Sequence, residues 1–461
     1  MAELSLMEKI VSLAKRRGFV FPGSEIYGGL AGTFDYGPFG LALKKNIENL
    51  WWRRFVENRD DMYGIDSAIL MNPRIWEASG HTTTFNDPLV TDTKTKKRYR
   101  ADHLLEEAGV NPTGMTPETM GKAIVEQGLT SPEGNPLSEP QQFNMMFKTA
   151  VGSTDGTDTT VYLRPETAQG MFVNFKNILD SFHPKLPFGL AQIGPAFRNE
   201  IAPREFLFRV RELEIMEFEY FIAEKEWESV FEMWRTQMHE WFSDIGFAKE
   251  DIQEVEVEGN DRAHYSKRTL DFYFKYPGGY KEIGGIAYRT DFDLKNHIEK
   301  SGTDLSYLDS ETNERFVPHV IEPTFGLGRH VLAALVSAYR EDELGGEMRT
   351  YLALSPKVAP VKAMVSPLLK NKPELVEKAR EVRAELRKVH PAIAWDDNGN
   401  IGKRYRRQDE IGTPFCVTID FDTLGETPEL ADTVTLRHRD TGEQERLTVS
   451  EVAKRIQAAV Q

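Results

Sequence analysis

The stretch that decides the fold is Phe206-Leu-Phe-Arg-Val-Arg-Glu-Leu-Glu-Ile-Met-Glu-Phe-Glu-Tyr-Phe-Ile222. Its side chains alternate, and successive side chains of a strand point to opposite faces of a sheet. The alternation predicts one long strand over residues 206–222. Because the second face mixes both charges, it favours a ligand-binding surface over a face that merely meets water. The first face holds Phe206, Phe208, Val210, Met216, Phe218 and Tyr220, and the second holds Arg209, Arg211, Leu213, Glu217 and Glu219.

Further strands lie on both sides of this stretch. Residues 188–200 have the pattern of a strand that runs into a turn. Pro277-Gly-Gly279 predicts a hairpin. A strand is expected over residues 317–323, after which Gly326-Leu-Gly-Arg329 opens a helix of small and apolar residues. The middle of the chain therefore contains a sheet with a helix at its edge.

The N-terminal third combines helices with a polar stretch. Ser5-Leu-Met-Glu8 is a capping box that starts a helix ending at Gly18. A second helix starts near Pro38, and its wide apolar stripe predicts burial in a core or in a subunit interface. Residues 81–160 are rich in Thr, Gly and Pro and predict an insertion with short elements of its own. We expect another insertion at about 245–315.

A domain boundary falls at Leu354-Ser-Pro-Lys-Val-Ala-Pro360. Beyond it, strands and helices alternate, as is typical of a compact α/β domain. The sequence thus predicts a first domain over residues 1–350 and a second over residues 355–461. The expected order in the second domain is strand 361–365, helix 374–390, strand 392–395, helix 400–411, strands 414–419 and 433–438, and helix 449–460.

The composition is that of a globular protein. Of the 461 residues, 40% are hydrophobic and 28% are charged, which suffices to bury a large core. No apolar run approaches the ~18 residues that would span a bilayer, and the N-terminus lacks the order of a signal peptide. The single cysteine, Cys416, excludes an internal disulfide framework and a Cys-rich zinc site. These features predict a cytoplasmic protein without a membrane partner.

The formal net charge of −15 argues against a protein that coats nucleic acid non-specifically, because phosphate binding needs local positive charge. Two short basic runs would still allow contact with one RNA. They are Lys94-Thr-Lys-Lys-Arg-Tyr-Arg100 and Lys403-Arg-Tyr-Arg-Arg407. The alternative for either run is a solvated surface with no RNA contact.

Three segments together carry a family pattern: Phe197–Glu200 with Phe208–Leu213, Tyr280–Asp291 with its Glu282-Ile283, and Glu322–Arg329. Phe197-Arg-Asn-Glu200 with Phe208-Arg-Val-Arg-Glu-Leu213 resembles motif 2 of the class II aminoacyl-tRNA synthetases, and Glu322-Pro-Thr-Phe-Gly-Leu-Gly-Arg329 resembles motif 3. Gly37-Pro38 and the helix after it resemble motif 1, the dimer-forming element. The resemblance implies an α/β (α+β) protein with an antiparallel sheet core, helices and insertions, followed by a C-terminal α/β anticodon-binding domain.

The finer resemblance is to the glycyl-tRNA synthetases, and it covers nearly the whole chain. It implies a homodimeric ligase that makes glycyl-adenylate from glycine and ATP and passes glycine to the 3′ end of tRNA(Gly). In the last domain, Lys403–Arg407 would contact RNA phosphates and Tyr405 would stack on a base. The segments that carry it are Tyr99-Arg-Ala-Asp-His-Leu-Leu105, Arg164-Pro-Glu-Thr-Ala-Gln-Gly170, Ala263-His-Tyr-Ser-Lys-Arg-Thr269, Glu322-Pro-Thr-Phe-Gly326 and Gly399-Asn-Ile-Gly-Lys-Arg-Tyr-Arg-Arg-Gln-Asp-Glu-Ile-Gly-Thr-Pro414.

The resemblance also implies catalytic roles for Arg198, Glu200, Glu282 and Arg329. Arg198 would hold the α-phosphate and the substrate carboxylate, since its planar fork donates bidentately to such oxygens. Arg329 would hold the γ-phosphate at a helix start, where the backbone dipole favours anions. Glu282 would contact ATP directly or through Mg²⁺, which prefers oxygen ligands. The implied ATP positions are Arg198, Asn199, Glu200, Phe208, Arg209, Val210, Arg211, Glu212, Leu213, Glu282, Ile283, Gly326, Leu327, Gly328 and Arg329.

For glycine, the implied pocket is a ring of carboxylates. Glu166, Glu217 and Glu322 would surround the ammonium group, and Arg100 matches the family's substrate-side arginine. Alternatively, some of these glutamates only pair with neighbouring arginines. Every competing amino acid is larger than glycine, so overlap excludes it and no editing domain is expected. The implied glycine positions are Arg100, Glu166, Leu213, Glu214, Ile215, Met216, Glu217, Glu322, Pro323, Thr324, Phe325 and Gly326.

The chain departs from the family pattern at three places. Leu213 stands where a phenylalanine usually stacks on adenine, and Thr324 replaces a frequent serine but keeps the hydroxyl. Residues 91–97 lack the cysteines of many bacterial members, so we expect no structural zinc there. Two other functions are considered. One is an inactive synthetase-like protein that binds RNA or a partner, and the other is a related synthetase for serine or threonine.

Overall fold

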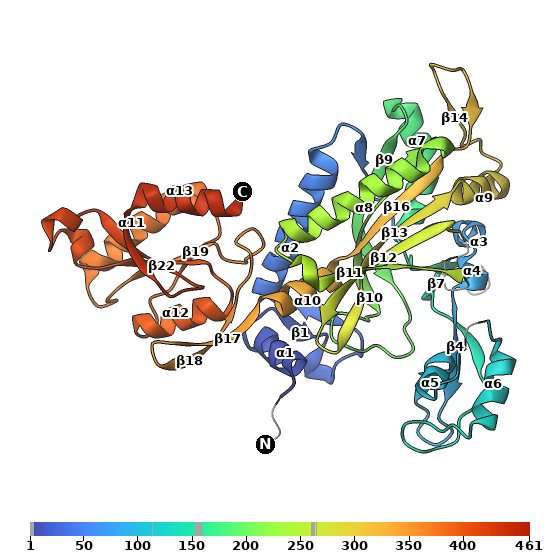
Figure 1. The fold of residues 1–461 in the computed structure, drawn as a ribbon, viewed down its shortest axis with the longest axis horizontal. Coiled ribbons are helices and arrows are strands. Elements are labelled where there is room, and N and C mark those ends of the chain that lie inside the picture. The colour runs from blue at the N-terminus through green and yellow to red at the C-terminus, as the bar shows by residue number, and fades with distance from the viewer. Residues whose placement is uncertain (1–3, 113, 153–158, 260–262, 264) are drawn as a thin grey trace.

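The computed structural model describes residues 4–112, 114–152, 159–259, 263 and 265–461 (Figure 1). His264, within one of the family-like segments, lies outside the described residues. At its centre is a seven-stranded sheet with the order β11-β12-β13-β16-β10-β9-β3. Neighbouring strands are antiparallel, except that β3 runs parallel to β9. The strands are β3 (Met62–Gly64), β9 (Phe188–Phe197), β10 (Glu212–Ile222), β11 (Ile252–Glu256), β12 (Arg268–Tyr276), β13 (Gly279–Thr290) and β16 (His319–Gly326). This mainly antiparallel core confirms the predicted fold class.

The long strand starts later than the alternation predicts. Strand β10 begins at Glu212, so the prediction of a strand from Phe206 is wrong for its first six residues. Glu205 and Phe206 have φ values of 63° and 55°, in the left-handed region, which cannot continue a strand. Residues 204–209 instead close a loop through an isolated bridge between Arg204 and Arg209. From Met216 onward, the alternation of apolar and acidic side chains is confirmed.

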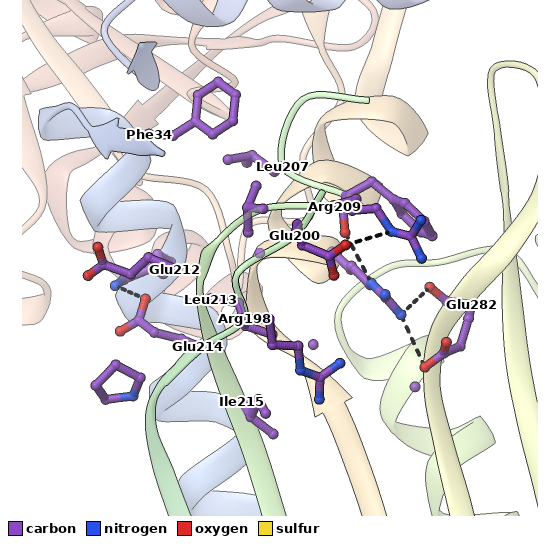
Figure 2. A pocket seen from close by; sticks show the side chains of 18 of the residues that line it. Phe34, Arg198, Glu200, Leu207, Arg209, Glu212, Leu213, Glu214, Ile215 and Glu282 are labelled. Carbon is purple, nitrogen blue, oxygen red and sulfur yellow. Dashed lines mark hydrogen bonds and ion pairs between the residues drawn. The ribbon is translucent and has the colours of Figure 1, made fainter. Parts of the chain in front are cut away.

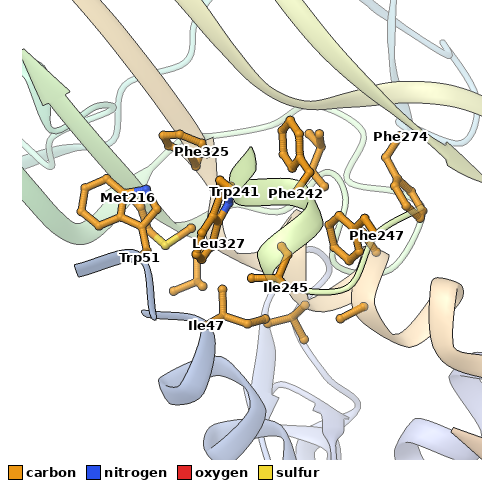
Figure 3. Packing of buried hydrophobic residues seen from close by; sticks show 14 of the residues in the cluster. Ile47, Trp51, Met216, Trp241, Phe242, Ile245, Phe247, Phe274, Phe325 and Leu327 are labelled. Atoms are coloured by element: carbon orange, nitrogen blue, oxygen red, sulfur yellow. The ribbon is translucent and has the colours of Figure 1, made fainter. Parts of the chain in front are cut away.

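One face of the sheet packs on helices through a large aromatic core (Figure 3). Trp51 on α2 lies 5.9 Å from Phe325 on β16 between ring centroids, and Trp234 on α8 lies 4.5 Å from Phe218 on β10. All four rings are fully buried. Burying such rings contributes the largest apolar areas of any side chains. The helices on this face are α1 (Leu6–Arg16), α2 (Pro38–Trp52), which continues as a π-helical turn over Arg53–Glu57, α8 (Trp227–Asp244) and α10 (Leu327–Ala338).

A second cluster of apolar residues covers part of the opposite face. Phe175 on α7 packs on Phe221 of β10 with ring centroids 4.6 Å apart, and Leu294 of α9 belongs to the same cluster. The rest of this face stays open or polar, which leaves room for a site. The elements nearby are α3 (Arg74–Ala78), α4 (His81–Thr84), α7 (Ala168–Phe182), α9 (Phe292–Ser301), and the hairpins β7–β8 (Lys148–Val151, Thr159–Tyr162) and β14–β15 (Tyr307–Leu308, Arg315–Phe316).

The two expected insertions differ in the structure. Most of residues 81–160 forms a separate module with its own small core around Val90 and Leu105, at the lower right of Figure 1. By contrast, residues 245–315 supply β11, β12 and β13 to the central sheet, because their alternating apolar side chains belong to the main core. The elements of the module are β4 (Asn86–Thr91), β5 (Arg98–Arg100), β6 (Gln141–Asn144), α5 (Ala101–Glu107) and α6 (Pro117–Glu126).

The C-terminal part forms an α/β unit beyond the hairpin β17–β18 (Tyr339–Leu344, Glu347–Leu352), at the left of Figure 1. Its five-stranded sheet has the order β20-β19-β21-β22-β23, and β23 is a strand that the sequence did not predict. The elements are β19 (Ala363–Pro367), β20 (Ile393–Trp395), β21 (Phe415–Ile419), β22 (Thr433–His438), β23 (Gln444–Thr448), α11 (Pro373–Val389), α12 (Ile401–Glu410) and α13 (Val449–Val460).

The remaining elements are short. None of the helices in the described ranges is long and apolar enough to cross a membrane. The two-stranded sheet β1–β2 lies between α1 and α2 along the chain. The short elements are β1 (Val20–Pro22), β2 (Phe34–Tyr36), and the 3-10 turns Glu25–Tyr27, Glu224–Glu226, Lys249–Asp251, Asp422–Leu424 and Pro428–Leu430.

Candidate active site

A cleft of about 540 Å³ opens above the central sheet (Figure 2). Its walls come from the ends of β9 and β10, from β13, β16 and the first turn of α10, and from β2 and α2. Segments far apart in the sequence therefore meet at one place. The cleft is lined by Phe34, Tyr36, Lys44, Pro195, Arg198, Glu200, Leu207, Phe208, Arg209, Val210, Glu212, Leu213, Glu214, Ile215, Glu282, Gly284, Thr324, Gly326, Gly328 and Arg329.

Arg329 forms one wall of the cleft. Its Nη1 lies 3.1 Å from Oε1 of Glu282 and donates to the Glu282 carbonyl oxygen at 3.1 Å. Its guanidinium also lies 4.5 Å from the ring centroid of Phe208. The side chain of Glu282 is 45% exposed and still offers oxygen atoms to a ligand. Opposite charges are thus fixed side by side at the start of α10.

Arg198 projects into the same cleft from the end of β9 (Figure 2). Its Nε donates to the carbonyl oxygen of Pro165 at 3.1 Å, and its guanidinium lies 5.7 Å from the ring of Phe85. Across the ranges that the structure describes, no carboxylate lies within ion-pair distance of it. The guanidinium is therefore positioned by a carbonyl and a ring, while its charge remains available to an anion.

The loop between β9 and β10 is held by two further arginines. Arg209 Nε lies 3.6 Å from a carboxylate oxygen of Glu200, and both side chains line the cleft. Arg211 donates to the carbonyl oxygens of Glu200 and Ala31, at 3.0 and 2.7 Å. Because its guanidinium donates to backbone carbonyl oxygens, Arg211 holds the loop in place. Its side chain does not line the cleft.

A buried group of carboxylates lies beside the cleft on the same face of the sheet. Glu217 accepts hydrogen bonds from the hydroxyls of Thr167 and Thr324, at 2.5 and 2.8 Å. The two hydroxyls hold both carboxylate oxygens in place. Burial raises the pKa of Glu217, with the nearby Glu166 adding to the rise. Any cation that entered here would meet carboxylate oxygens held in fixed positions.

Arg289 on β13 supplies the positive charge of this group. It donates to Glu322 at 2.6 Å and to both carboxylate oxygens of Asp293, at 2.8 and 2.9 Å. All three side chains are buried. The alternative that some glutamates pair with arginines therefore applies to Glu322. A buried pair of this kind persists only when its hydrogen bonds are complete.

Glu166 lies at the outer edge of this group. One of its oxygens accepts from Gln169 at 3.0 Å, and the other lies 3.2 Å from Nε2 of His81. Burial alone would raise its pKa, but His81 and Arg289 outweigh burial and hold the pKa of Glu166 below its ordinary value. Glu166 is therefore ionised at neutral pH.

Arg100 lies in the insertion module and does not line the cleft. It donates to Asp87 at 2.8 Å and to Asp102 through Nε at 3.0 Å, so its charge is shared with two carboxylates. Burial raises the pKa of Asp87 to about 6 against the effect of Arg100. The guanidinium of Arg100 is therefore directed at carboxylates of the insertion module.

The structure brings most of the implied site residues together. The cleft or the carboxylate group beside it contains 17 of them. Four others, Ile283, Met216, Phe325 and Leu327, have fully buried side chains in the aromatic core on the far face of the sheet. For Ile283, Met216 and Phe325, alternation along a strand turns the side chains away from the site. Leu327 points into the core from the first turn of α10. Asn199 binds the Met145 carbonyl oxygen through its backbone N–H.

Several lining residues were missed by the sequence interpretation. Phe34 and Tyr36 come from β2, and Lys44 comes from α2, which resembles the dimer-forming motif. Lys44 forms an ion pair with Glu214 and lies 5.0 Å from the ring centroid of Tyr36. A signal for Lys44 was present, since a lysine on the buried side of an apolar helix needs a partner.

The basic run of the last domain is mostly structural. Arg404 is buried and donates to Ser366 and to the carbonyl oxygens of Pro367, Asp397 and Gly399. Tyr405 shares a hydrogen bond of 2.7 Å with Thr418, and its ring lies under the guanidinium of Arg437 at 4.7 Å. The hypothesis that the whole run contacts RNA is therefore wrong for these two side chains, because both are engaged within the domain. Arg407 likewise pairs with Asp396 at 2.8 Å.

The mainly antiparallel sheet, with arginines from a strand–loop–strand unit and from a helix start meeting over one cleft, defines a class II aminoacyl-tRNA synthetase. Residues 147–339 match the family model "tRNA synthetase class II core domain (G, H, P, S and T)", and residues 362–459 match "Anticodon binding domain". The chain is 46% identical to a glycine–tRNA ligase of Thermus thermophilus, over 97% of each chain. It is 47% identical to those of Bacillus cereus, over 99% of each chain, and Caldanaerobacter subterraneus, over 97% of each. The chain belongs to the glycine–tRNA ligase family, which confirms the resemblance.

Proposed function

We propose that this chain ligates glycine to tRNA(Gly) in two steps, both at the cleft described above. In the first step the carboxylate of glycine attacks the α-phosphorus of ATP, forming glycyl-adenylate and releasing pyrophosphate. In the second step a terminal hydroxyl of the tRNA takes the glycyl group and AMP leaves. The observation that carries the proposal is the convergence of Arg198, Glu282 and Arg329 on one cleft.

Arg198 and Arg329 neutralise the anions that must meet in the first step. Adenylation brings a carboxylate to a triphosphate, so positioning and electrostatics dominate its catalysis. Arg198 holds the α-phosphate and the carboxylate, because its guanidinium is oriented and pairs with no acid among the described residues. Arg329 holds the γ-phosphate at the start of α10, where the helix dipole adds to its charge. No general base is needed, since a carboxylate is already the nucleophile.

Glu282 is the residue of the cleft best suited to a Mg²⁺ ion that arrives with ATP. Its carboxylate is exposed to the cleft, and Glu200 offers a second carboxylate on the same lining. Hard oxygen donors of this kind fit Mg²⁺, which is usually held by one or two carboxylates together with substrate phosphates. The ion would reduce the negative charge of the phosphates.

The ammonium group of glycine binds among the buried carboxylates. Glu217 is held by Thr167 and Thr324, and Thr324 also lines the cleft, which joins the two regions. Glu166 and Glu322 complete the ring. A side chain larger than hydrogen would overlap with these packed groups, so glycine is selected by size.

The two parts of the chain divide the work. We assign residues 1–350 to catalysis and residues 355–461 to the anticodon of tRNA(Gly). Support for the second assignment comes from the match of residues 362–459 to an anticodon-binding model. The insertion module around β4–β6 lies at the opposite end of the catalytic part (Figure 1), where it would be free to approach other parts of the tRNA.

We also propose that the protein is a cytoplasmic homodimer. The segment before α2 exposes apolar side chains: Ile26 is 89% exposed, Tyr27 87% and Leu30 59%. Exposed apolar side chains that gather in one segment mark an interface. Sedimentation of wild type and of an Ile26→Asp, Tyr27→Asp double variant tests the dimer. The wild type should sediment as a dimer and the variant as a monomer; a monomeric wild type would contradict it.

Glu217→Gln tests the assignment of the ammonium site. The variant keeps the shape but removes the charge that faces the ammonium group. A charge-assisted hydrogen bond contributes about 1.5–3 kcal/mol, so the KM for glycine in ATP–pyrophosphate exchange should rise roughly 10- to 100-fold. The KM for ATP should stay within about twofold. An unchanged KM for glycine would remove Glu217 from the site.

A further inference from the structure

Glu219 is a buried acid for which the two-step reaction gives no role. It lies on β10 two residues after Glu217, so both side chains point to the same face. In the register that pairs Glu217 with Thr324 and Tyr220 with Ile321, Glu219 lies across from Glu322 of β16. Its side chain is fully buried. Glu219 therefore lies beneath the proposed ammonium site.

The carboxylate of Glu219 forms no hydrogen bond with the described residues. One oxygen from each of Glu217, Glu219 and Glu322 falls within 4.8 Å of the others. Ionising this carboxylate is costly, because it has lost water without gaining a hydrogen bond, and the nearby Arg289 is bonded to Glu322 and Asp293 instead.

The neighbouring donors are all directed at the other acids. Thr167 and Thr324 donate to Glu217, and Arg289 donates to Glu322 and Asp293. Burial raises the pKa of Glu219 well above its ordinary value, and Glu322 adds to the rise. Burial also raises the pKa of Glu322, and Arg289 opposes the rise for both acids, but Arg289 donates a hydrogen bond to Glu322 and none to Glu219 among the described residues. A single proton shared within the cluster is thus held best on Glu219.

We infer that Glu219 is a positioning residue: as a neutral carboxylic acid it donates its O–H to the Glu217 and Glu322 carboxylates and aims them at the ammonium group of glycine. The inference rests on the proposed glycine site. A neutral acid supplies a donor where an ionised one would repel both neighbours. The charged groups that face Glu219 are Glu217, Glu322, Arg289 and Asp293.

Two substitutions separate this role from simple packing. In Glu219→Gln, the amide N–H replaces the acid O–H, so the KM for glycine should stay within about threefold of wild type. In Glu219→Leu, the volume is kept but the donor is lost, so the KM for glycine should rise roughly tenfold or more while the KM for ATP stays unchanged. Equal KM values for glycine in Glu219→Leu and wild type would overturn the inference, as would a Glu219→Gln variant that is folded but as impaired as Glu219→Leu.

Infrared spectroscopy detects whether the carboxyl group of Glu219 is protonated, and the measurement does not depend on enzyme activity. The difference spectrum between wild type and Glu219→Gln should contain the carbonyl band of a protonated carboxyl group. Carboxylate bands in its place would overturn the inference, and so would a stoichiometric metal ion that wild type holds and Glu219→Gln loses. Glu217→Gln separates the two proposals: an unchanged KM for glycine in that variant defeats the glycine site, whereas the infrared result concerns Glu219 alone.

Discussion

Arg329 and Glu282 are joined twice, since Nη1 of Arg329 lies 3.1 Å from the Glu282 carboxylate and donates to the Glu282 carbonyl oxygen at the same distance. One contact would let either side chain swing away. Two contacts fix the guanidinium relative to the strand as well as to the carboxylate. The start of α10 is therefore held against strand β13 at one wall of the cleft.

This pairing predicts the behaviour of Glu282→Gln. The substitution removes one negative charge that orients Arg329 and, in our proposal, binds Mg²⁺ with ATP. We expect the KM for ATP to rise roughly tenfold, corresponding to about 1.4 kcal/mol, and the Mg²⁺ concentration for half-maximal exchange to increase. Exchange rates over a series of Mg²⁺ concentrations measure both. A Mg²⁺ dependence identical to that of wild type would contradict the metal assignment.

Arg198→Ala should abolish ATP–pyrophosphate exchange. Removing a group aimed at developing charge typically costs about 10²–10³ in rate. The fold should survive, since the Arg198 side chain donates only to one backbone carbonyl of the described residues. Arg340→Ala, on an exposed hairpin, is the matched control and should exchange like wild type. Exchange at the wild-type rate by a correctly folded Arg198→Ala would exclude Arg198 from the mechanism.

His330 predicts how stability depends on pH. Its Nε2 accepts from the Trp241 indole at 3.1 Å while Nδ1 faces the Gly326 carbonyl oxygen at 2.8 Å, which requires the neutral ring. Burial lowers the pKa of His330 to about 4, against about 6.5 in the unfolded chain. Between these two pKa values, His330 binds a proton in the unfolded chain but not in the native state. The free energy of unfolding therefore falls as the pH drops through this window.

The loss from His330 alone should be about 2 kcal/mol between about pH 7 and about pH 5. Urea unfolding of wild type, His330→Gln and the exposed-site control His183→Gln at these two pH values measures it. The difference between the two pH values should shrink in His330→Gln and persist in His183→Gln. An equal pH dependence in all three proteins would contradict the account.

Asp409 predicts a stability effect far from the cleft. It is fully buried and accepts from Arg437 at 2.8 and 2.9 Å, and it lies 3.2 Å from Arg349 of the hairpin β17–β18. Asp409→Asn removes the negative charge that pairs with two buried guanidinium groups. This should lower the free energy of unfolding by roughly 3–5 kcal/mol. Asp180→Asn, whose ion pair with Lys176 is exposed on both sides, should cost less than about 1 kcal/mol. Urea unfolding of the two variants compares these losses. Equal losses would show that Asp409 does not link the hairpin β17–β18 to the C-terminal α/β unit.

The sequence predicted those parts of the fold that local patterns encode. Apolar alternation gave the face of β10, and turn residues gave the hairpin between β12 and β13. It did not predict where β10 starts, because the left-handed backbone at Glu205 and Phe206 has no signal in these side-chain types. The sequence interpretation also placed residues 245–315 in an insertion. The pairing of β13 with β16 is a long-range contact, which a local pattern of side chains does not reveal.

The site was predicted to a similar extent. The resemblance to the family motifs identified Arg198, Glu282 and Arg329, which the structure places on one cleft. It could not show that Arg404 and Tyr405 turn inward, because a basic helix looks the same whether its arginines meet solvent or carbonyl groups. Glu219 was recognised only as one acid of an alternating strand, since its lack of partners is a property of the packed structure.

The most direct test of the central claim is ATP–pyrophosphate exchange by the purified protein, measured separately with glycine, alanine and serine. If the arginines and carboxylates of this cleft activate the smallest amino acid, glycine should support exchange, and alanine and serine should not. No exchange with glycine, or exchange with alanine at a comparable rate, would contradict the account.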